Sequence, residues 1–69
     1  MERTYISSTS VVSIGYDPAL QVLEIEYHQG NVYQYQGVPQ DVFDQLMGSP
    51  SKGAFINDQI KKFYVFVKV

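Results

Sequence analysis

The chain has 69 residues, a formal net charge of −2 and no cysteine. This length suffices for one domain, and the lack of cysteine together with a single histidine excludes a disulfide framework and an ordinary zinc site. A core this small must therefore rely on dense aromatic packing, which six Tyr and four Phe can supply, or on self-association.

The charge is unevenly distributed along the chain. Residues 1–51 carry six acidic residues against Arg3, whereas residues 52–69 carry four lysines against Asp58. A nucleic-acid binder is usually basic overall, and this chain is not. Only its C-terminal part can form a local basic patch. No apolar run approaches the ~20 residues of a membrane helix, and the N-terminus lacks the apolar core of a signal peptide. We therefore expect a cytoplasmic protein with no membrane contact.

The N-terminal part predicts a polar lead-in followed by a strand. Residues 1–9 include several Ser and Thr, which indicates a loosely ordered or edge-forming segment. From Val11 to Tyr16 apolar residues alternate with others, and this period places Val12, Ile14 and Tyr16 on one face of a strand.

A turn and a second strand follow. Asp17-Pro18 predicts the turn, because Pro fixes φ and the Asp carboxylate can accept an Asx-type hydrogen bond. Residues 21–27 are the clearest strand in the chain. Its two faces differ in character, with Leu23, Ile25 and Tyr27 on one and Glu24 and Glu26 on the other.

The next hairpin decides the orientation of two tyrosines. Gly30 can adopt the positive φ of a tight turn, and residues 31–36 return as a third strand. A three-residue loop over residues 28–30 pairs Tyr33 and Tyr35 with the apolar residues of the preceding strand. A two-residue loop pairs them with its glutamates, because a slip of one residue turns every side chain to the other face. We favour the longer loop, which leaves the glutamates outside.

Two short helices are predicted next. Val38-Pro39 opens the first, with Pro at the first helical position, where its missing N–H costs nothing. Asp41 complements the helix dipole in the first turn, and Gly48 ends the helix. Its apolar stripe consists of Val38, Val42, Phe43, Leu46 and Met47.

The second helix follows directly, with Ser49 as its N-cap and Pro50 at its first position. The last run, residues 63–69, alternates and is rich in valine, which predicts a fourth strand in the same sheet or in that of a neighbouring molecule. The inward side of the second helix comprises Phe55, Ile56, Ile60 and Phe63.

These elements predict one α+β domain over residues 1–69: a three-stranded antiparallel meander, with two short helices packed on one face and a C-terminal strand. Because the helices cover one face only, the other would expose three valines beside the glutamates, namely Val11, Val22 and Val32. Such a patch, together with the small size, the low net charge and the valine-rich last strand, predicts a homo-oligomer. The core candidates are Ile14, Tyr16, Leu23, Ile25, Tyr27, Tyr35, Val42, Phe43, Leu46, Phe55, Ile56, Ile60 and Phe63.

Several short motifs follow one another along the chain: Ile14-Gly15-Tyr16-Asp17, Leu23-Glu24-Ile25-Glu26-Tyr27, Gly30, Tyr33-Gln34-Tyr35, Val38-Pro39, Ser51-x-Gly53-x-Phe55-x-Asn57 and Ile60. In this order they resemble the KTSC domain, a module found alone in bacterial and phage proteins and at the C-terminus of some lysyl-tRNA synthetases. The resemblance runs from about Ser8 to Tyr64, and the family's central tyrosine motif falls on Tyr33 and Tyr35. It implies a bacterial or phage protein, and the synthetase fusion suggests RNA binding.

Tyr33 and Tyr35 have two alternative roles. Their rings can stack on nucleic-acid bases, which contributes roughly 1–3 kcal/mol per base whatever the sequence. In the alternative they are core residues whose hydroxyls hydrogen-bond to loops, as the favoured hairpin register predicts.

Residues 49–53 form the second candidate site. They place backbone N–H groups, two hydroxyls and an ammonium at a helix N-terminus, which suits a phosphate or a carboxylate, with Asn57 nearby. In the alternative they are a capping motif in which Gly53 allows close packing. The candidate ligand-binding residues are therefore Ser49, Ser51, Lys52, Gly53, Asn57, Tyr33 and Tyr35.

No catalytic site, metal site or cofactor is predicted. His28 has no second histidine and no cysteine with which to share a metal. Glu24 and Glu26 lie on an open strand face, without the cleft that acid–base catalysis requires. We expect a non-enzymatic binding module for RNA or another phosphate-bearing nucleotide. The alternative is a protein-interaction module, such as a phage-encoded inhibitor or adaptor, that binds a host protein through the uncovered sheet face or the last strand.

Overall fold

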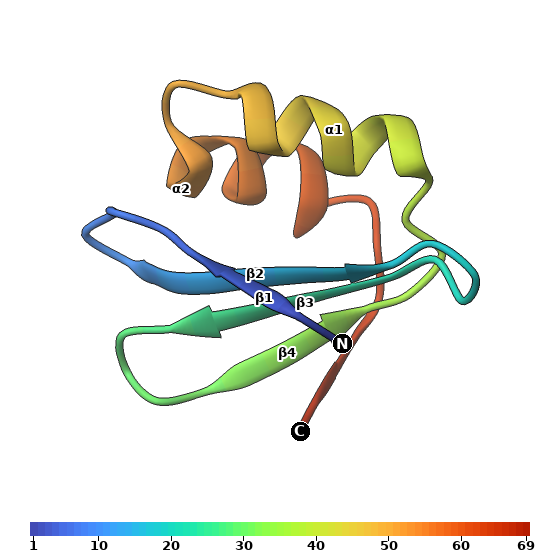
Figure 1. Ribbon diagram of the computed structural model, residues 1–69, viewed down its shortest axis with the longest axis horizontal. Coiled ribbons are helices and arrows are strands. Elements are labelled where there is room, and N and C mark those ends of the chain that lie inside the picture. The colour runs from blue at the N-terminus through green and yellow to red at the C-terminus, as the bar shows by residue number, and fades with distance from the viewer.

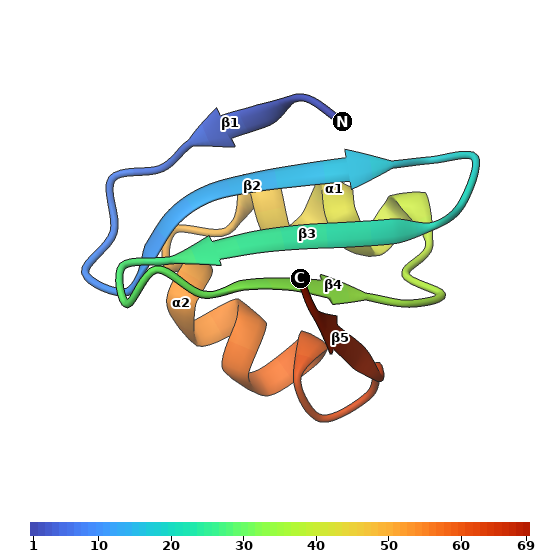
Figure 2. The same ribbon diagram turned by 90° about the horizontal axis from the view of Figure 1, so that it is seen from below.

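The sheet is built in chain order, with each strand antiparallel to the one before it. The computed structural model describes residues 1–69, and its strands are β1 (Arg3–Tyr5), β2 (Val11–Asp17), β3 (Val22–Tyr27), β4 (Val32–Tyr35) and β5 (Phe66–Lys68). Helix α1 (Gln40–Gly48) and helix α2 (Lys52–Phe55), which continues as the π-helical turn η1 (Ile56–Ile60), lie on one face of the sheet (Figure 1). Figure 2 shows the strands side by side in front of the helices.

The α+β class and the antiparallel arrangement are confirmed, but the sheet has five strands rather than a three-stranded meander with one addition. Strand β1 forms within the predicted lead-in, where Arg3 pairs with Gly15 and Tyr5 with Ser13. The C-terminal strand is shorter than predicted, because residues 61–63 form a turn after η1. It joins the same sheet, beside β4.

The β3–β4 hairpin has the three-residue register, which confirms the favoured prediction. Leu23 lies opposite Tyr35, and Ile25 lies opposite Tyr33. Both tyrosines therefore share the side of the sheet that carries the helices. Gly30 makes the turn possible, because its φ of 91° would strain any residue with a Cβ atom.

A β-bulge in β2 overturns one part of the predicted face assignment. Val11 pairs with Tyr27 and Ser13 with Glu26, so Val12 is an extra residue without a partner. The bulge turns Val11 toward the helices, where it is fully buried, while Val12 is only partly buried. The prediction that Val12 faces the core and Val11 the outside is wrong, because a strict two-residue period cannot anticipate an inserted residue.

The Asp17-Pro18 turn is confirmed, with the Asp17 carboxylate as its hydrogen-bond acceptor. Its Oδ1 accepts from the backbone N–H groups of Ala19 (3.0 Å) and Leu20 (3.2 Å). This Asx-type geometry reverses the chain directly into β3.

Both helices begin later than predicted. Pro39 is the N-cap of α1, with an extended ψ of 157°, rather than its first helical residue. Ser51, not Ser49, caps α2, and its Oγ accepts from the Ala54 N–H over 3.4 Å. Two serines flank Pro50, and only one of them has a hydroxyl within reach of an N–H group in the first turn. None of the helices has the length and the apolar composition of a membrane-spanning segment.

The core lies between the helices and the sheet. The predicted stripe of α1 is confirmed, since Leu46 is buried and Phe43 stacks on Tyr16 with ring centroids 4.6 Å apart. The prediction missed the burial of Val11 and counted Val38 only as part of the helix stripe. The buried cluster consists of Val11, Ile14, Leu23, Ile25, Tyr35, Val38, Leu46, Ile56 and Ile60.

Phe63 does not belong to the core, contrary to prediction. It is 68% exposed, because the helix ends at Ile60 and the chain turns before Phe63 can face inward. Tyr64, the next residue, packs against the core instead.

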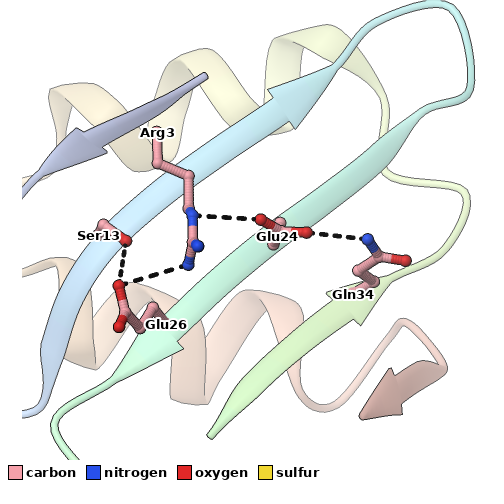
Figure 3. A network of polar contacts seen from close by, with 5 residues as sticks. All are labelled: Arg3, Ser13, Glu24, Glu26 and Gln34. Atoms are coloured by element: carbon pink, nitrogen blue, oxygen red, sulfur yellow. Dashed lines mark hydrogen bonds and ion pairs between the residues drawn. The ribbon is translucent and has the colours of Figure 1, made fainter. Parts of the chain in front are cut away.

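A polar network covers the face of the sheet that carries no helix. Arg3 on β1 reaches across β2 to two carboxylates of β3, with Nε 3.2 Å from Glu24 Oε2 and Nη1 3.3 Å from Glu26 Oε1. Ser13 Oγ donates to Glu26 over 2.9 Å, and Gln34 Nε2 donates to Glu24 over 2.8 Å. Four strands are thus joined by side chains (Figure 3).

The predicted valine patch on this face is therefore wrong for β2 and β3. Val11 lies in the core, and Val22 is only 8% exposed. Val32 is partly buried beside Glu26.

Gly15 leaves the room that Arg3 needs to cross β2. A Cβ atom at Gly15 would lie 2.8 Å from Arg3 Cγ and 2.8 Å from the Glu2 carbonyl oxygen. We expect Gly15→Ala to lower the free energy of unfolding by roughly 1–3 kcal/mol, because β1 must shift away and distort both ion pairs. Thermal and denaturant unfolding measure the change.

Gly48→Ala is the matched control for this prediction. A Cβ atom there meets nothing within 4 Å, and Gly48 lies in the last turn of α1. This variant should leave stability unchanged or raise it by up to ~1 kcal/mol. Equal losses in the two variants would contradict the role assigned to Gly15.

Candidate functional site

A polar groove runs between the loop before β2 and the start of α2. It has a volume of about 700 Å³, and five hydroxyl side chains line it together with Lys52, Gly53 and Asn57. We call it the hydroxyl groove. The five hydroxyl residues are Ser7, Ser8, Thr9, Ser10 and Ser51.

Hydrogen bonds within the loop and to the β3–β4 hairpin hold the loop that forms one wall of the hydroxyl groove. Ser8 Oγ accepts from the backbone N–H groups of Ser10 (3.3 Å) and Val11 (3.4 Å). His28, at the tip of the β3–β4 hairpin, contacts this loop twice. Its backbone N–H donates to the Ser10 carbonyl over 3.0 Å, and its ring Nε2 lies 2.9 Å from the Ser8 carbonyl oxygen. The loop is therefore tied to the sheet.

The opposite wall approaches the loop closely because Gly53 has no side chain. A Cβ atom at Gly53 would lie only 3.1 Å from Ser10 Oγ. The predicted packing role of this glycine is thus confirmed.

Ser49 and Lys52 shape the turn between α1 and α2. Ser49 Oγ donates to the Ser51 carbonyl over 3.0 Å and accepts from the Ser51 N–H over 3.3 Å. The Lys52 ammonium donates to the Ser49 carbonyl over 3.1 Å. An ammonium has three donors, so this bond holds Lys52 in place and leaves further donors for an acceptor in the groove.

A second cavity of about 370 Å³, the tyrosine hollow, continues the hydroxyl groove. The two share Thr9, Ser10, Gly53 and Asn57 as lining residues. The hollow is further lined by His28 and Lys61 and by two aromatic rings, those of Tyr27 and Tyr33. These rings lie 5.4 Å apart at an interplanar angle of 60°, and Lys61 Nζ lies 5.4 Å from the centroid of the Tyr27 ring.

The residues that line the groove and the hollow include positively charged side chains and no negatively charged one. Neither is lined by an aspartate or a glutamate, whereas Lys52 lies in one and Lys61 in the other. Glu24 and Glu26 are held by Arg3 on the opposite face of the sheet. The two glutamates of β3 are thus kept away from the groove and the hollow.

Tyr35 lies behind the tyrosine hollow, in the core. It is 1% exposed, and its hydroxyl lies 3.0 Å from that of Tyr27. Burial, and then the hydrogen bond with Tyr35, raise the pKa of Tyr27 far above the usual value for a tyrosine. Burial likewise raises the pKa of Tyr35. The pair is therefore a neutral hydrogen-bonded link between core and hollow.

Most of the predicted site residues come together in space. Ser51, Lys52, Gly53 and Asn57 line the groove, and Tyr33 lines the hollow. Ser49 and Tyr35 support the site from behind without lining it. The residues that sequence reasoning missed are Ser7, Ser8, Thr9, Ser10, Tyr27, His28 and Lys61.

One signal for the missed wall was present in the sequence. Residues 7–10 are four consecutive hydroxyl residues, but nothing local indicates that they meet the start of α2, more than forty positions later. For Lys61, the π-helical turn places the side chain over Tyr27, a geometry that helical periodicity does not predict.

Known proteins resemble this chain over nearly its whole length. The model of the KTSC domain matches residues 7–64, which include the hydroxyl run and both lysines of the site. The crystal structure of a KTSC domain protein from Yersinia pestis has 40% sequence identity and a TM-score of 0.93, and the match covers 99% of this chain and 96% of that one.

Two kinds of bacterial relative are found among curated proteins. A protein of Stutzerimonas stutzeri is 39% identical over 61 residues, which is 88% of this chain and 86% of that protein. A lysine–tRNA ligase of Nostoc punctiforme is 38% identical over 56 residues, which is 81% of this chain but 10% of the ligase. The similarity is thus to one segment of that enzyme. These matches confirm the resemblance predicted from the sequence.

The Tyr27–Tyr35 pair predicts a loss of stability in alkali. The unfolded chain releases its tyrosine protons at about pH 10, whereas the folded chain retains those of this pair because their pKa values are raised. Above that pH the unfolded state binds fewer protons, so the free energy of unfolding falls as pH rises; below it the contribution of the pair is complete. Denaturant unfolding as a function of pH measures the slope.

Tyr27→Phe removes one of the two groups, so its stability should fall less steeply above about pH 10 than that of the parent chain. Tyr5→Phe is the control, since it removes one hydroxyl from a residue that is 79% exposed and does not belong to the pair. A parent chain whose stability is independent of pH in this range would contradict the assignment.

Proposed function

The chain belongs to the KTSC domain family, and we propose that it is a non-enzymatic module that binds RNA or another phosphate-bearing nucleotide. One observation carries this proposal: a continuous, acid-free groove has hydroxyls and a lysine at one end and tyrosine rings with a second lysine at the other. A nucleotide has the same two parts, an anionic phosphate and a flat base.

The hydroxyl groove is the proposed phosphate site. Phosphate oxygens are strong acceptors, and Lys52 supplies a charged donor that its bond to Ser49 already holds in place. The hydroxyls of the 7–10 loop can rotate toward an acceptor, because a hydroxyl is both a donor and an acceptor. The absence of carboxylates from the lining removes the repulsion that an anion would otherwise meet.

The tyrosine hollow is the proposed base site. Tyr33 is half-buried and presents part of its ring to the hollow beside Tyr27. Stacking on such a ring contributes roughly 1–3 kcal/mol per base and tolerates any base. Lys61, which also lines the hollow, adds a positive charge close to the ring of Tyr27.

The relatives support RNA as the source of the phosphate. The similar segment of the Nostoc proteins belongs to enzymes named as ligases of lysine and tRNA. A small domain attached to such an enzyme has an RNA within reach.

A non-enzymatic role is supported by the chemistry of the lining. The one histidine of the site, His28, lies at hydrogen-bond distance from the Ser8 carbonyl oxygen through Nε2 and has no carboxylate partner in the groove. None of the hydroxyls is hydrogen-bonded to a general base, which nucleophilic catalysis requires.

Lys52→Ala should weaken the binding of a short single-stranded RNA. Loss of one charge-assisted hydrogen bond removes roughly 1.5–3 kcal/mol, about a tenfold loss of affinity or more. The slope of log affinity against log salt should decrease by about 0.7. Fluorescence anisotropy of a labelled oligonucleotide at several salt concentrations measures both quantities.

Lys62→Ala is the matched control, because it removes the same charge from an exposed residue that lines neither cavity. A thermal-shift comparison of RNA with adenosine monophosphate then separates polymer from free nucleotide. If neither probe shifts the melting temperature, or if Lys62→Ala weakens binding as much as Lys52→Ala, the proposed function fails.

A further inference from the structure

Strand β5 is an open, apolar edge of the sheet. It pairs with β4 on one side, and no further strand of the sheet lies on the other (Figure 2). Val67 lies opposite Gln34 on the face without helices. Phe66, Val67 and the two valines that flank the strand are largely solvent-exposed: Val65 76%, Phe66 54%, Val67 53% and Val69 62%. Exposed edges of this kind pair readily with another strand.

The backbone of β5 determines which groups are free for such pairing. The Val65 carbonyl accepts from the Gln36 N–H over 2.9 Å, and the Val69 N–H donates to the Val32 carbonyl over 2.8 Å. Along an antiparallel strand the backbone N–H and C=O groups of successive residues point alternately to the two neighbouring sides. The backbone groups of the odd-numbered residues therefore point toward β4. The N–H and C=O groups of Phe66 and Lys68 therefore point away from the sheet.

We propose that β5 pairs with β5 of a second copy of this chain, antiparallel, about a two-fold axis that passes beside Val67. In this register Phe66 lies opposite Lys68 of the partner, and the four free backbone groups of each copy form four hydrogen bonds between the strands. Val67 lies opposite its own counterpart, and Val65 lies opposite Val69. The two sheets become one, with the helices of both copies on the same side.

The two neighbouring registers, with the axis at Phe66 or at Lys68, are less favourable. An axis at Phe66 would require free groups at Tyr64, but the Tyr64 N–H already donates to the Ile60 carbonyl over 3.1 Å. An axis at Lys68 would place two ammonium groups directly opposite one another, which is destabilising. The register at Val67 instead places each Lys68 ammonium beside an aromatic ring.

A second copy fits this edge better than an unrelated strand does. The pattern of β5 is complementary to itself in the register at Val67, with apolar residues opposite apolar ones on the open face. The other edge strand, β1, carries Arg3 and Thr4 and is held in the Arg3 network, so it offers no such match. Three residues per strand bury less than the ~1,200 Å² of a standard interface, so a reversible, concentration-dependent dimer is expected.

Cysteine cross-linking tests the register directly, because the chain contains no other cysteine. In a non-hydrogen-bonded antiparallel pair the two Cβ atoms lie within reach of a disulfide. Val67→Cys should therefore form a covalent dimer rapidly with oxidised glutathione. Val65→Cys should not link to itself, but a mixture of Val65→Cys and Val69→Cys should give the mixed dimer.

A matched pair of charge variants provides a second test. Phe66→Glu places a carboxylate opposite Lys68 of the partner, whereas Phe66→Lys places a like charge there. Sedimentation equilibrium should show that Phe66→Glu retains the dimer and that Phe66→Lys weakens it at least tenfold. High salt should reduce the difference between them.

Three results would overturn the proposal. The first is a parent chain that stays monomeric at every concentration up to its solubility limit. The second is cross-linking of Val65→Cys to itself as fast as that of Val67→Cys. The third is an equal effect of the two Phe66 variants, which would indicate that β5 contacts a different surface or a different protein.

Discussion

The register of the β3–β4 hairpin is the constraint on which the other features depend. With Gly30 in the left-handed region, Tyr33 and Tyr35 lie on the helix side and Glu24 and Glu26 on the other. A shift of β4 by one residue would turn both rings to the glutamate face of the sheet and place Gln34 under the helices instead. The same register brings Tyr33 to the tyrosine hollow and Tyr35 into the core, so one turn determines both part of the core and the aromatic lining of the candidate site.

The N-terminal segment links the two faces of the sheet. Arg3 is anchored to the glutamates on the face without helices, while the loop that follows β1 forms a wall of the groove near α2. The bulge at Val12 follows this loop, and it redirects Val11 into the core. The ion pairs are partly exposed and individually weak. Their structural effect is to hold β1 at the edge from which the loop departs.

Periodicity predicted the features that depend on one strand or one helix at a time. The alternation of residues 22–27, the apolar stripe of α1 and the hairpin register all follow from where side chains must point. The bulge, strand β1 and the true cap at Ser51 could not be predicted in this way. Each depends on a contact with a distant segment or, for the cap, on which of the two serines that flank Pro50 reaches an N–H group of the first turn. The groove could not be predicted from periodicity either, because its walls come from opposite ends of the chain.

The ring of Tyr33 is flanked by two other aromatic rings. Tyr27 lies on one side, and Phe66 on the other with its centroid 4.8 Å away. A ring held in this way loses its rotameric freedom when the chain folds rather than when a ligand arrives, so the stacking surface is preorganised. One of the flanking residues belongs to the short edge strand β5. Fraying of that strand would release Tyr33, so the rigidity of the hollow depends on the last strand of the sheet.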